Sequence, residues 1–131
     1  MSRAIHTIGI VGVRDYRGSL YTNVTYIHRT IEKHLTLHGS SYGSIAVVTG
    51  GGRGVDQMVM DWCDAKEIPY HRIPPNIEKF GTPRAFTMRN NHIVHESNEL
   101  IMFWDGRIDT VIEAIATAAH QSKKSTVYPI I

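Results

Sequence analysis

A run of glycines follows the second apolar segment of the chain, between Thr49 and Asp56. Successive glycines let backbone amides approach an anion closely, and a helix that begins directly after them adds the partial positive charge of its amino terminus. The segment is therefore predicted to bind a phosphate group. It lacks the ending of a Walker loop and the full dinucleotide fingerprint, so a tight turn in which Asp56 only favours the first helical turn is the alternative. The candidate ligand-binding residues are Gly50, Gly51, Gly52, Arg53, Gly54 and Asp56.

Polar residues also follow the first apolar segment, in the sequence Gly12-Val13-Arg14-Asp15. Arg14 has the fork of donors that clamps a phosphate, and Asp15 has the carboxylate that holds a sugar hydroxyl or orients the arginine. We include Gly12, Arg14 and Asp15 among the candidate ligand-binding residues. An ion pair on the surface of a loop is the alternative.

A third pair of candidates, Arg89 and Asn90, interrupts an apolar helical face. Phe86 and Ile93 lie two turns apart on this face, and the two polar residues stand between them at helical spacing. A guanidinium placed against the body of a protein is costly unless it is paired or lines a cleft. The position therefore indicates either a binding site or a structural salt bridge.

The fourth segment follows an apolar strand at Trp104 and Asp105 and continues to Glu113. Trp104 at a strand end has the flat ring that stacks on a nucleobase. Asp109 and Thr110 stand where a helix begins, and Glu113 follows Thr110 at the spacing of a capping box. On spacing alone, these residues either cap the helix or take part in a site.

The elements that must position these segments alternate between strands and helices. Strands are predicted at residues 6–13, 44–49, 70–73, 99–104 and 126–131, and helices at residues 22–37, from 55 onward, 84–96 and 108–120. The connection that reaches Pro83 contains adjacent prolines and is predicted to form neither regular helix nor central strand. The pattern indicates an α/β, three-layer Rossmann-like domain with an open, mainly parallel sheet of about five strands. In such a sheet ligands bind beyond the carboxyl ends of the strands, which is where the polar segments stand.

The composition is that of an ordinary globular chain. With 131 residues, 42% hydrophobic and 20% charged, it has the size of one domain, residues 1–131. The lack of a long apolar stretch and the single cysteine, Cys63, predict a cytoplasmic protein with no membrane partner. A net charge of +2 with scattered basic residues argues against nucleic acid as a partner.

Two other kinds of chemistry find little support. His92 and His95 lie beside Glu96, but the sequence suggests no third ligand, so we expect no metal site and no cofactor. Cys63 belongs to an apolar helical stripe and has no base near it in sequence, which argues against a nucleophilic cysteine.

The four segments, in this order, resemble the SLOG superfamily, a Rossmann-like group that includes the Lonely-guy (LOG) phosphoribohydrolases and the DNA-processing protein DprA. The chain is most similar to the small YspA/YpsA-related branch, whose members carry three motifs. This chain reproduces them as Gly12-Val13-Arg14-Asp15, Gly51-Gly52-Arg53-Gly54-Val55-Asp56 and Arg89-Asn90. The resemblance covers nearly the whole chain and implies a SLOG-like domain that binds a nucleotide or a nucleotide-derived signal. It also implies a homodimer or a higher homo-oligomer.

The resemblance to LOG enzymes implies particular catalytic roles if the chain is an enzyme. By position, Arg89 and Glu113 match the arginine and glutamate that support hydrolysis of the N-glycosidic bond. Thr110 matches the threonine of the LOG glycine motif, whereas Trp104-Asp105 and Asp109 depart from that motif.

These matches and departures leave three hypotheses for the function. We expect a protein that senses or sequesters a nucleotide-type small molecule, with a nucleoside 5′-monophosphate N-glycosidase as the alternative. A DNA-binding module, suggested by the kinship with DprA, is the third hypothesis and the one that the net charge favours least.

Overall fold

The computed structural model describes residues 5–12, 20–39, 44–52, 54–82, 84–106 and 110–130. Within these residues five strands form one parallel sheet, in the order β3-β2-β1-β4-β5. The predicted α/β class and the open parallel sheet of five strands are therefore confirmed. The strands are β1 (Ile5–Gly12), β2 (Ser44–Thr49), β3 (Tyr70–Arg72), β4 (Glu99–Trp104) and β5 (Lys124–Pro129).

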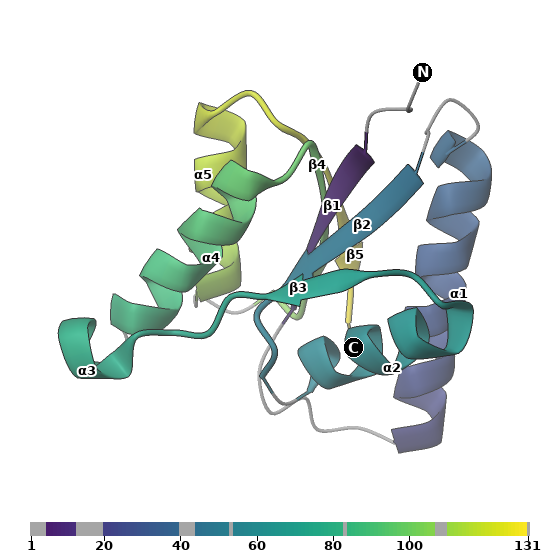
Figure 1. The fold of residues 1–131 in the computed structure, drawn as a ribbon, viewed down its shortest axis with the longest axis horizontal. Coiled ribbons are helices and arrows are strands. Elements are labelled where there is room, and N and C mark those ends of the chain that lie inside the picture. Colours follow the sequence, from purple (N-terminus) through teal and green to yellow (C-terminus); the bar gives the residue numbers. More distant parts are fainter. Residues whose placement is uncertain are drawn as a thin grey trace.

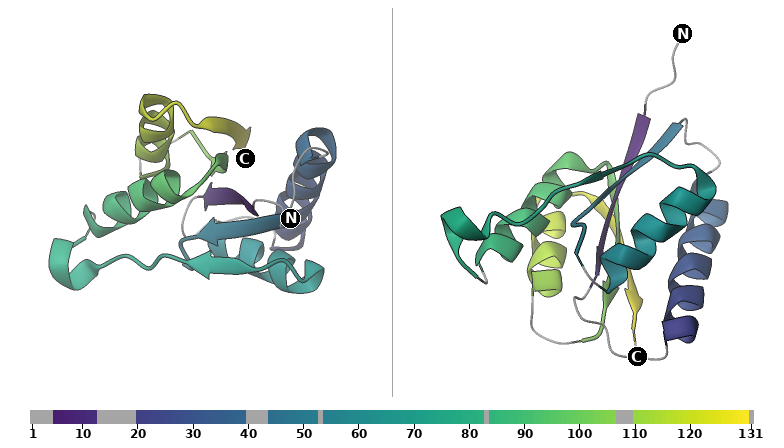
Figure 2. Two further views of the ribbon diagram at one scale, coloured as in Figure 1. Left: turned by 45° about the horizontal axis from the view of Figure 1, so that its top comes forward. Right: turned by 60° about the horizontal axis from the view of Figure 1, so that its bottom comes forward.

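Helices cover both faces of this sheet and give the predicted three layers. The longer helices are α1 (Leu20–His38), α2 (Val55–Lys66), α4 (Arg84–Glu96) and α5 (Thr110–His120). Helices α1 and α2 lie on one side of the sheet, and α4 and α5 lie on the other (Figures 1 and 2). Between β3 and β4 the chain crosses from one side of the sheet to the other. The connection that leaves β1 therefore runs to one side of the sheet, and the connection that leaves the neighbouring strand β4 runs to the opposite side. This divergence is the switch point at which folds of this class bind ligands.

The core lies where the sheet is covered on both faces. Four consecutive residues of β4, from Leu100 to Phe103, each have 0% exposure. A continuous apolar run of this kind is typical of a parallel strand with helices on both sides. Helix α1 contributes Ile27 and Ile31 at a spacing of four, as its apolar stripe predicts.

Several element boundaries differ from the sequence prediction by one or two residues, and one short helix was not predicted. The connection before Pro83 contains a one-turn helix, α3 (Ile77–Phe80), so the prediction of no regular helix there was wrong. The turn fits because the prolines flank it, and the side chain of Asn76 caps it by accepting a hydrogen bond of 3.1 Å from the amide of Lys79. Strand β5 begins at Lys124, two residues earlier than predicted, because Lys124 and Ser125 already pair with β4.

A buried polar network joins the amino ends of the strands to helix α1. Glu99, the first residue of β4, is 1% exposed, and its two carboxylate oxygens lie 2.9 Å from His6 Nε2 and 2.8 Å from His34 Nε2. His34 Nδ1 lies 2.7 Å from the hydroxyl of Tyr128. Burial and the charge of Glu99 raise the pKa of Tyr128, whose hydroxyl is protonated at neutral pH even without this shift. The sequence analysis missed this network, although a charged residue at the head of an apolar strand was a signal for it.

Among the described residues, no helix has both the length and the apolar character that are needed to cross a lipid bilayer.

We predict that Glu99→Ala lowers the free energy of unfolding by about 1–3 kcal/mol, because it leaves Nε2 of the buried His34 without its hydrogen-bond partner. Glu96→Ala is the matched control. Its carboxylate lies 3.4 Å from His92 at an exposed position, and its loss should change stability by no more than about 0.5 kcal/mol. Urea denaturation followed by circular dichroism measures both, and equal effects of the two variants would contradict the role of the network.

Candidate functional site

The carboxyl ends of β1 and β2 meet the start of helix α2. Gly12, the last residue of β1, faces Val55, the first residue of α2. A Cβ placed on Gly12 would overlap the Val55 side chain and would lie 2.8 Å from its Cγ2. Gly12 is therefore required for the close approach of β1 to the β2–α2 connection. The structure brings together these two strand ends, as the sequence predicts.

Asp56 holds the connection between β2 and α2, which we call the glycine loop and of which the structure describes residues 50–52 and 54. The carboxylate is 4% exposed, with Oδ1 accepting a hydrogen bond of 3.2 Å from Thr49 Oγ1 and Oδ2 accepting one of 3.1 Å from the amide of Gly52. The amide of Gly52 thus already has a hydrogen-bond acceptor within the protein. Asp56 therefore binds residues that precede the helix, and its role is not limited to favouring the first helical turn. Contact of Asp56 with a ligand stays a prediction.

Arg89 holds the same loop from the opposite face of the sheet. Its side chain projects from α4, is 5% exposed, and donates from Nη1 to the carbonyl of Gly50 at 3.1 Å. Nε donates to Oδ1 of Asn90 at 2.7 Å, and Cζ lies 5.4 Å from the centre of the Phe86 ring. The expectation that both polar residues face the body of the protein is confirmed. The bonds to Gly50 and Asn90 give Nη1 and Nε acceptors within the protein, which lowers the cost of burying the guanidinium.

Gly50 lies between these two charged side chains. A Cβ at this position would overlap Nη1 of Arg89 and would lie 2.8 Å from Oδ2 of Asp56. A buried cation and a buried anion therefore flank one backbone position, where their opposite charges favour each other in a medium of low polarity.

The end of β4 supplies the next part of the site. Residue Phe103 pairs with Gly12, so Trp104 and Asp105 extend one and two residues beyond the end of β1. Both are partly exposed, and the carbonyl of Trp104 accepts a hydrogen bond of 2.9 Å from the amide of Ile130. Trp104 packs against the core, so its role as a stacking platform stays a prediction.

Several predicted residues fall outside the described part of the chain: Arg14, Asp15, Arg53 and Asp109. Thr110 is the first residue of α5, and Glu113 lies one turn later with an exposed side chain. The carbonyl of Glu113 accepts a hydrogen bond of 3.0 Å from Thr117 Oγ1. The predicted catalytic pair thus consists of a buried Arg89 on α4 and an exposed Glu113 on α5.

Two hollows lie near these elements. One, of about 260 Å³, lies beside Arg89 under the connection between β3 and α4, and Ile73, Phe80 and Met88 help to line it. The other, of about 520 Å³, lies over the face of β1, β2 and β3, and none of the described residues of the glycine loop lines it. Among the predicted site residues that the structure describes, Arg89 lines the smaller hollow and none lines the larger one.

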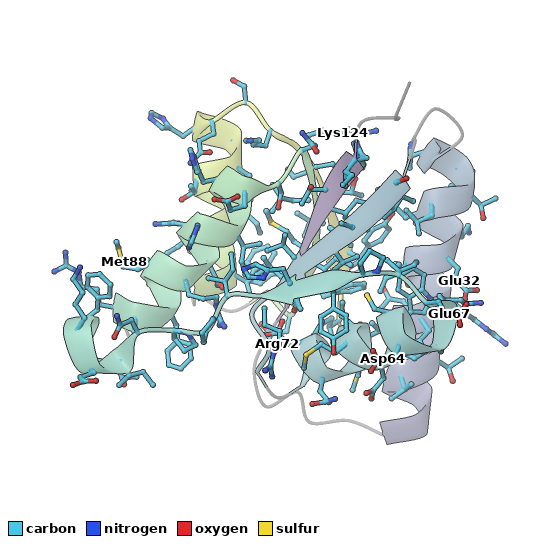
Figure 3. All side chains as sticks on the ribbon, viewed as in Figure 1. Glu32, Asp64, Glu67, Arg72, Met88 and Lys124 are labelled. Carbon is cyan, nitrogen blue, oxygen red and sulfur yellow. The ribbon has the colours of Figure 1, made fainter. Side chains whose placement is uncertain are left out.

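Arg72 is a residue of this region that the sequence analysis missed. It is the last residue of β3, and it pairs with Thr49 at the start of the glycine loop. Its side chain is exposed and lies below the end of β3 in Figure 3. The signal was its place at the carboxyl end of a predicted strand, although the sequence does not show which strand β3 joins.

Cys63 is buried in α2, and burial raises the pKa of its thiol to about 12. The thiolate is the reactive form of cysteine, so this environment keeps the side chain inert. The sequence expectation that Cys63 is a core residue is confirmed by its 0% exposure.

The fold and the glycine loop together define a Rossmann-like domain. No protein-family model and no curated protein matches the sequence. Among solved structures, the X-ray structure of TM1055, a structural-genomics target, aligns with a TM-score of 0.65 and 18% identity over 92% of this chain and 72% of that chain.

Two structures of DNA processing protein A (DprA) also align. For the protein from Streptococcus pneumoniae, the TM-score is 0.70 at 12% identity, over 97% of this chain and 51% of that one. For the protein from Helicobacter pylori, the TM-score is 0.59 at 16% identity, over 96% and 66%. The chain thus spans about half of the Streptococcus pneumoniae structure. This chain shares the α/β Rossmann-like fold of TM1055 and DprA.

The likeness to DprA corrects one expectation. The Helicobacter pylori structure describes a mode of single-stranded DNA binding, so the argument against nucleic acid as a partner was wrong. That argument used the net charge of +2. Net charge is a sum over the whole chain, whereas contacts with a phosphate backbone depend on where individual cations lie.

We predict that Gly50→Ala lowers the free energy of unfolding by at least about 1–3 kcal/mol, because the added methyl group must displace the Arg89 guanidinium or the backbone. Gly52→Ala is the control in the same loop. The closest atom to its added Cβ is Asp56 Oδ2 at 3.3 Å, so the loss should be smaller. The double variant Gly50→Ala/Arg89→Ala should lose less than the sum of the single variants. Urea denaturation measures all four, and strictly additive losses would contradict the overlap.

We predict that Cys63 resists thiol reagents in the folded protein. With a pKa of about 12, only about one thiol in ten thousand is ionised at pH 8, and the ionised fraction grows as the pH rises towards the pKa. Ellman's reagent should react slowly with the native protein and rapidly after unfolding in guanidinium chloride. Fast stoichiometric reaction of the native protein would contradict this environment.

Proposed function

We propose that the chain binds a nucleotide or a nucleotide-derived small molecule at the carboxyl ends of β1, β2 and β4, and that it senses or sequesters this ligand. The observation that carries the proposal is the glycine loop, held between Asp56 and Arg89 beside the end of β1. A loop whose shape is set before the ligand arrives loses little conformational entropy on binding. The loop lies beside the end of β1, which is one of the two strands at the switch point, and ligands of such folds bind near that point.

The three sequence motifs support a finer assignment, to the small YspA/YpsA-related branch of the SLOG group. We further propose that residues 1–131 act as one domain in the cytoplasm, as a homo-oligomer. The single buried cysteine is compatible with that location, since a reducing compartment does not call for disulfides.

The state of Arg89 favours binding over LOG-like hydrolysis. A catalytic arginine must direct donors at the substrate, whereas Nη1 and Nε of Arg89 already donate to Gly50 and Asn90. Rearrangement of this buried side chain would leave the carbonyl of Gly50 without its donor. We therefore treat Arg89 as a residue that positions the loop.

Single-stranded nucleic acid is the second candidate ligand, at the same strand ends. The observation that favours it is the shared fold with DprA from Helicobacter pylori, whose structure concerns single-stranded DNA binding. A polynucleotide presents the same phosphates and bases as a free nucleotide, so one loop suits both.

The first experiment is mass spectrometry of the small molecules that are released when the purified protein is heated, followed by incubation of the protein with the nucleotide recovered. We expect an intact nucleotide that remains intact, and Glu113→Ala should bind it as tightly as the wild type. Free base and ribose phosphate that accumulate with the wild type, and not with Glu113→Ala, would instead establish the N-glycosidase.

A parallel titration separates the polymer from the monomer. Fluorescence anisotropy of a labelled oligothymidylate, repeated at rising salt concentration, should show affinity that falls steeply if phosphates of a polymer are the ligand. Tight, salt-sensitive binding of the oligomer together with no binding of 5′-nucleotides would replace the small-molecule proposal.

A further inference from the structure

The position of Arg72 is fixed by the pairing of β3 with β2. Its backbone is the partner of Thr49, the last residue of β2, and the amide of the next residue, Ile73, donates to the carbonyl of Thr49 at 2.9 Å. Arg72 therefore stands directly beside the point at which the glycine loop leaves the sheet.

The aliphatic part of Arg72 packs over Gly51. A Cβ placed on Gly51 would lie 2.8 Å from Cδ of Arg72 and 3.2 Å from its Cβ and Cγ. Gly51 has a φ of 72°, so any other residue would be strained as well as crowded there. The loop thus carries a glycine at the position that the arginine covers, and the arginine stem is held against the loop backbone.

The charged end of Arg72 differs from that of Arg89. Arg72 is exposed, and in the part of the chain that the structure describes its guanidinium takes part in no hydrogen bond or ion pair. Arg89 is buried and donates to Gly50 and Asn90. An arginine whose stem is packed while its head is exposed keeps its fork of donors available, and this fork matches two oxygens of a phosphate.

We infer that Arg72 binds the anionic group of the ligand, a phosphate carried by a nucleotide, while Arg89 shapes the loop beneath it. This inference rests on the proposed function. Arg72 distinguishes a nucleotide from the corresponding nucleoside, because the guanidinium meets only the phosphate. Figure 3 shows the side chain at the end of β3, next to the β2–α2 connection.

The test compares binding of four 5′-monophosphates, AMP, GMP, CMP and UMP, with binding of their nucleosides by isothermal titration calorimetry. We expect the wild type to bind at least one monophosphate about tenfold or more tightly than its nucleoside. Arg72→Ala should remove this preference and leave the affinity for the nucleoside unchanged. Arg72→Lys should retain part of it, because lysine keeps the charge but lacks the fork.

Arg29→Ala is the matched control, since Arg29 is an exposed arginine on α1 and its loss should leave the preference intact. If Arg72→Ala keeps the preference for the monophosphate, the inference is overturned and the proposed function stands. Equal losses for monophosphate and nucleoside would also overturn it, since they indicate a change in the loop itself. If the wild type binds none of the eight compounds, both this inference and the small-molecule function are overturned.

Discussion

The buried guanidinium of Arg89 holds the backbone of the glycine loop against the sheet. Its bond to the carbonyl of Gly50 reaches across from the α4 face, while the carboxylate of Asp56 binds Thr49 and Gly52 from the start of α2. Each charge is buried, so neither is stable there without its partners. The loop can keep its shape only while α2, α4 and the end of β2 are all in place, which makes its geometry a product of the whole fold.

The two ends of the sheet carry different polar arrangements. At the amino ends, Glu99 binds His6 and His34 in a network that is satisfied within the protein. At the carboxyl ends, Asp56 and Arg89 also bond within the protein, but the exposed Arg72 lies over the same loop. A closed network contributes to stability, whereas an exposed cation beside a shaped loop is suited to a ligand.

The comparisons show how far a fold can be shared when sequences differ. DprA and TM1055 align with this chain at 12–18% identity and share its α/β Rossmann-like fold. At that distance the fold is common, but the side chains at the strand ends decide what each protein binds. For the same reason the net charge gave the wrong expectation about nucleic acid, because a sum of charges says little about where individual cations lie.

The sequence by itself determined most of the elements and placed the candidate residues at one edge of the sheet. The apolar period of the helices, the buried run of β4 and the glycines after Thr49 are local signals that span a few residues, so they can be recognised without the fold. They also identified Arg89 and Asn90 as buried polar residues. The one-turn helix α3 was not predicted, because the prolines on both sides of it indicate a loop and four residues are too few to show a helical period.

Only the tertiary structure decided which cation holds the glycine loop and which one faces outward. Arg89 lies 39 residues from Gly50 along the chain, and its contact depends on α4 packing across the sheet. Arg72 reaches Gly51 because β3 pairs with β2 in the register Thr49 to Arg72. Strand order and register arise from long-range packing of the apolar core, and no local pattern of residues specifies them.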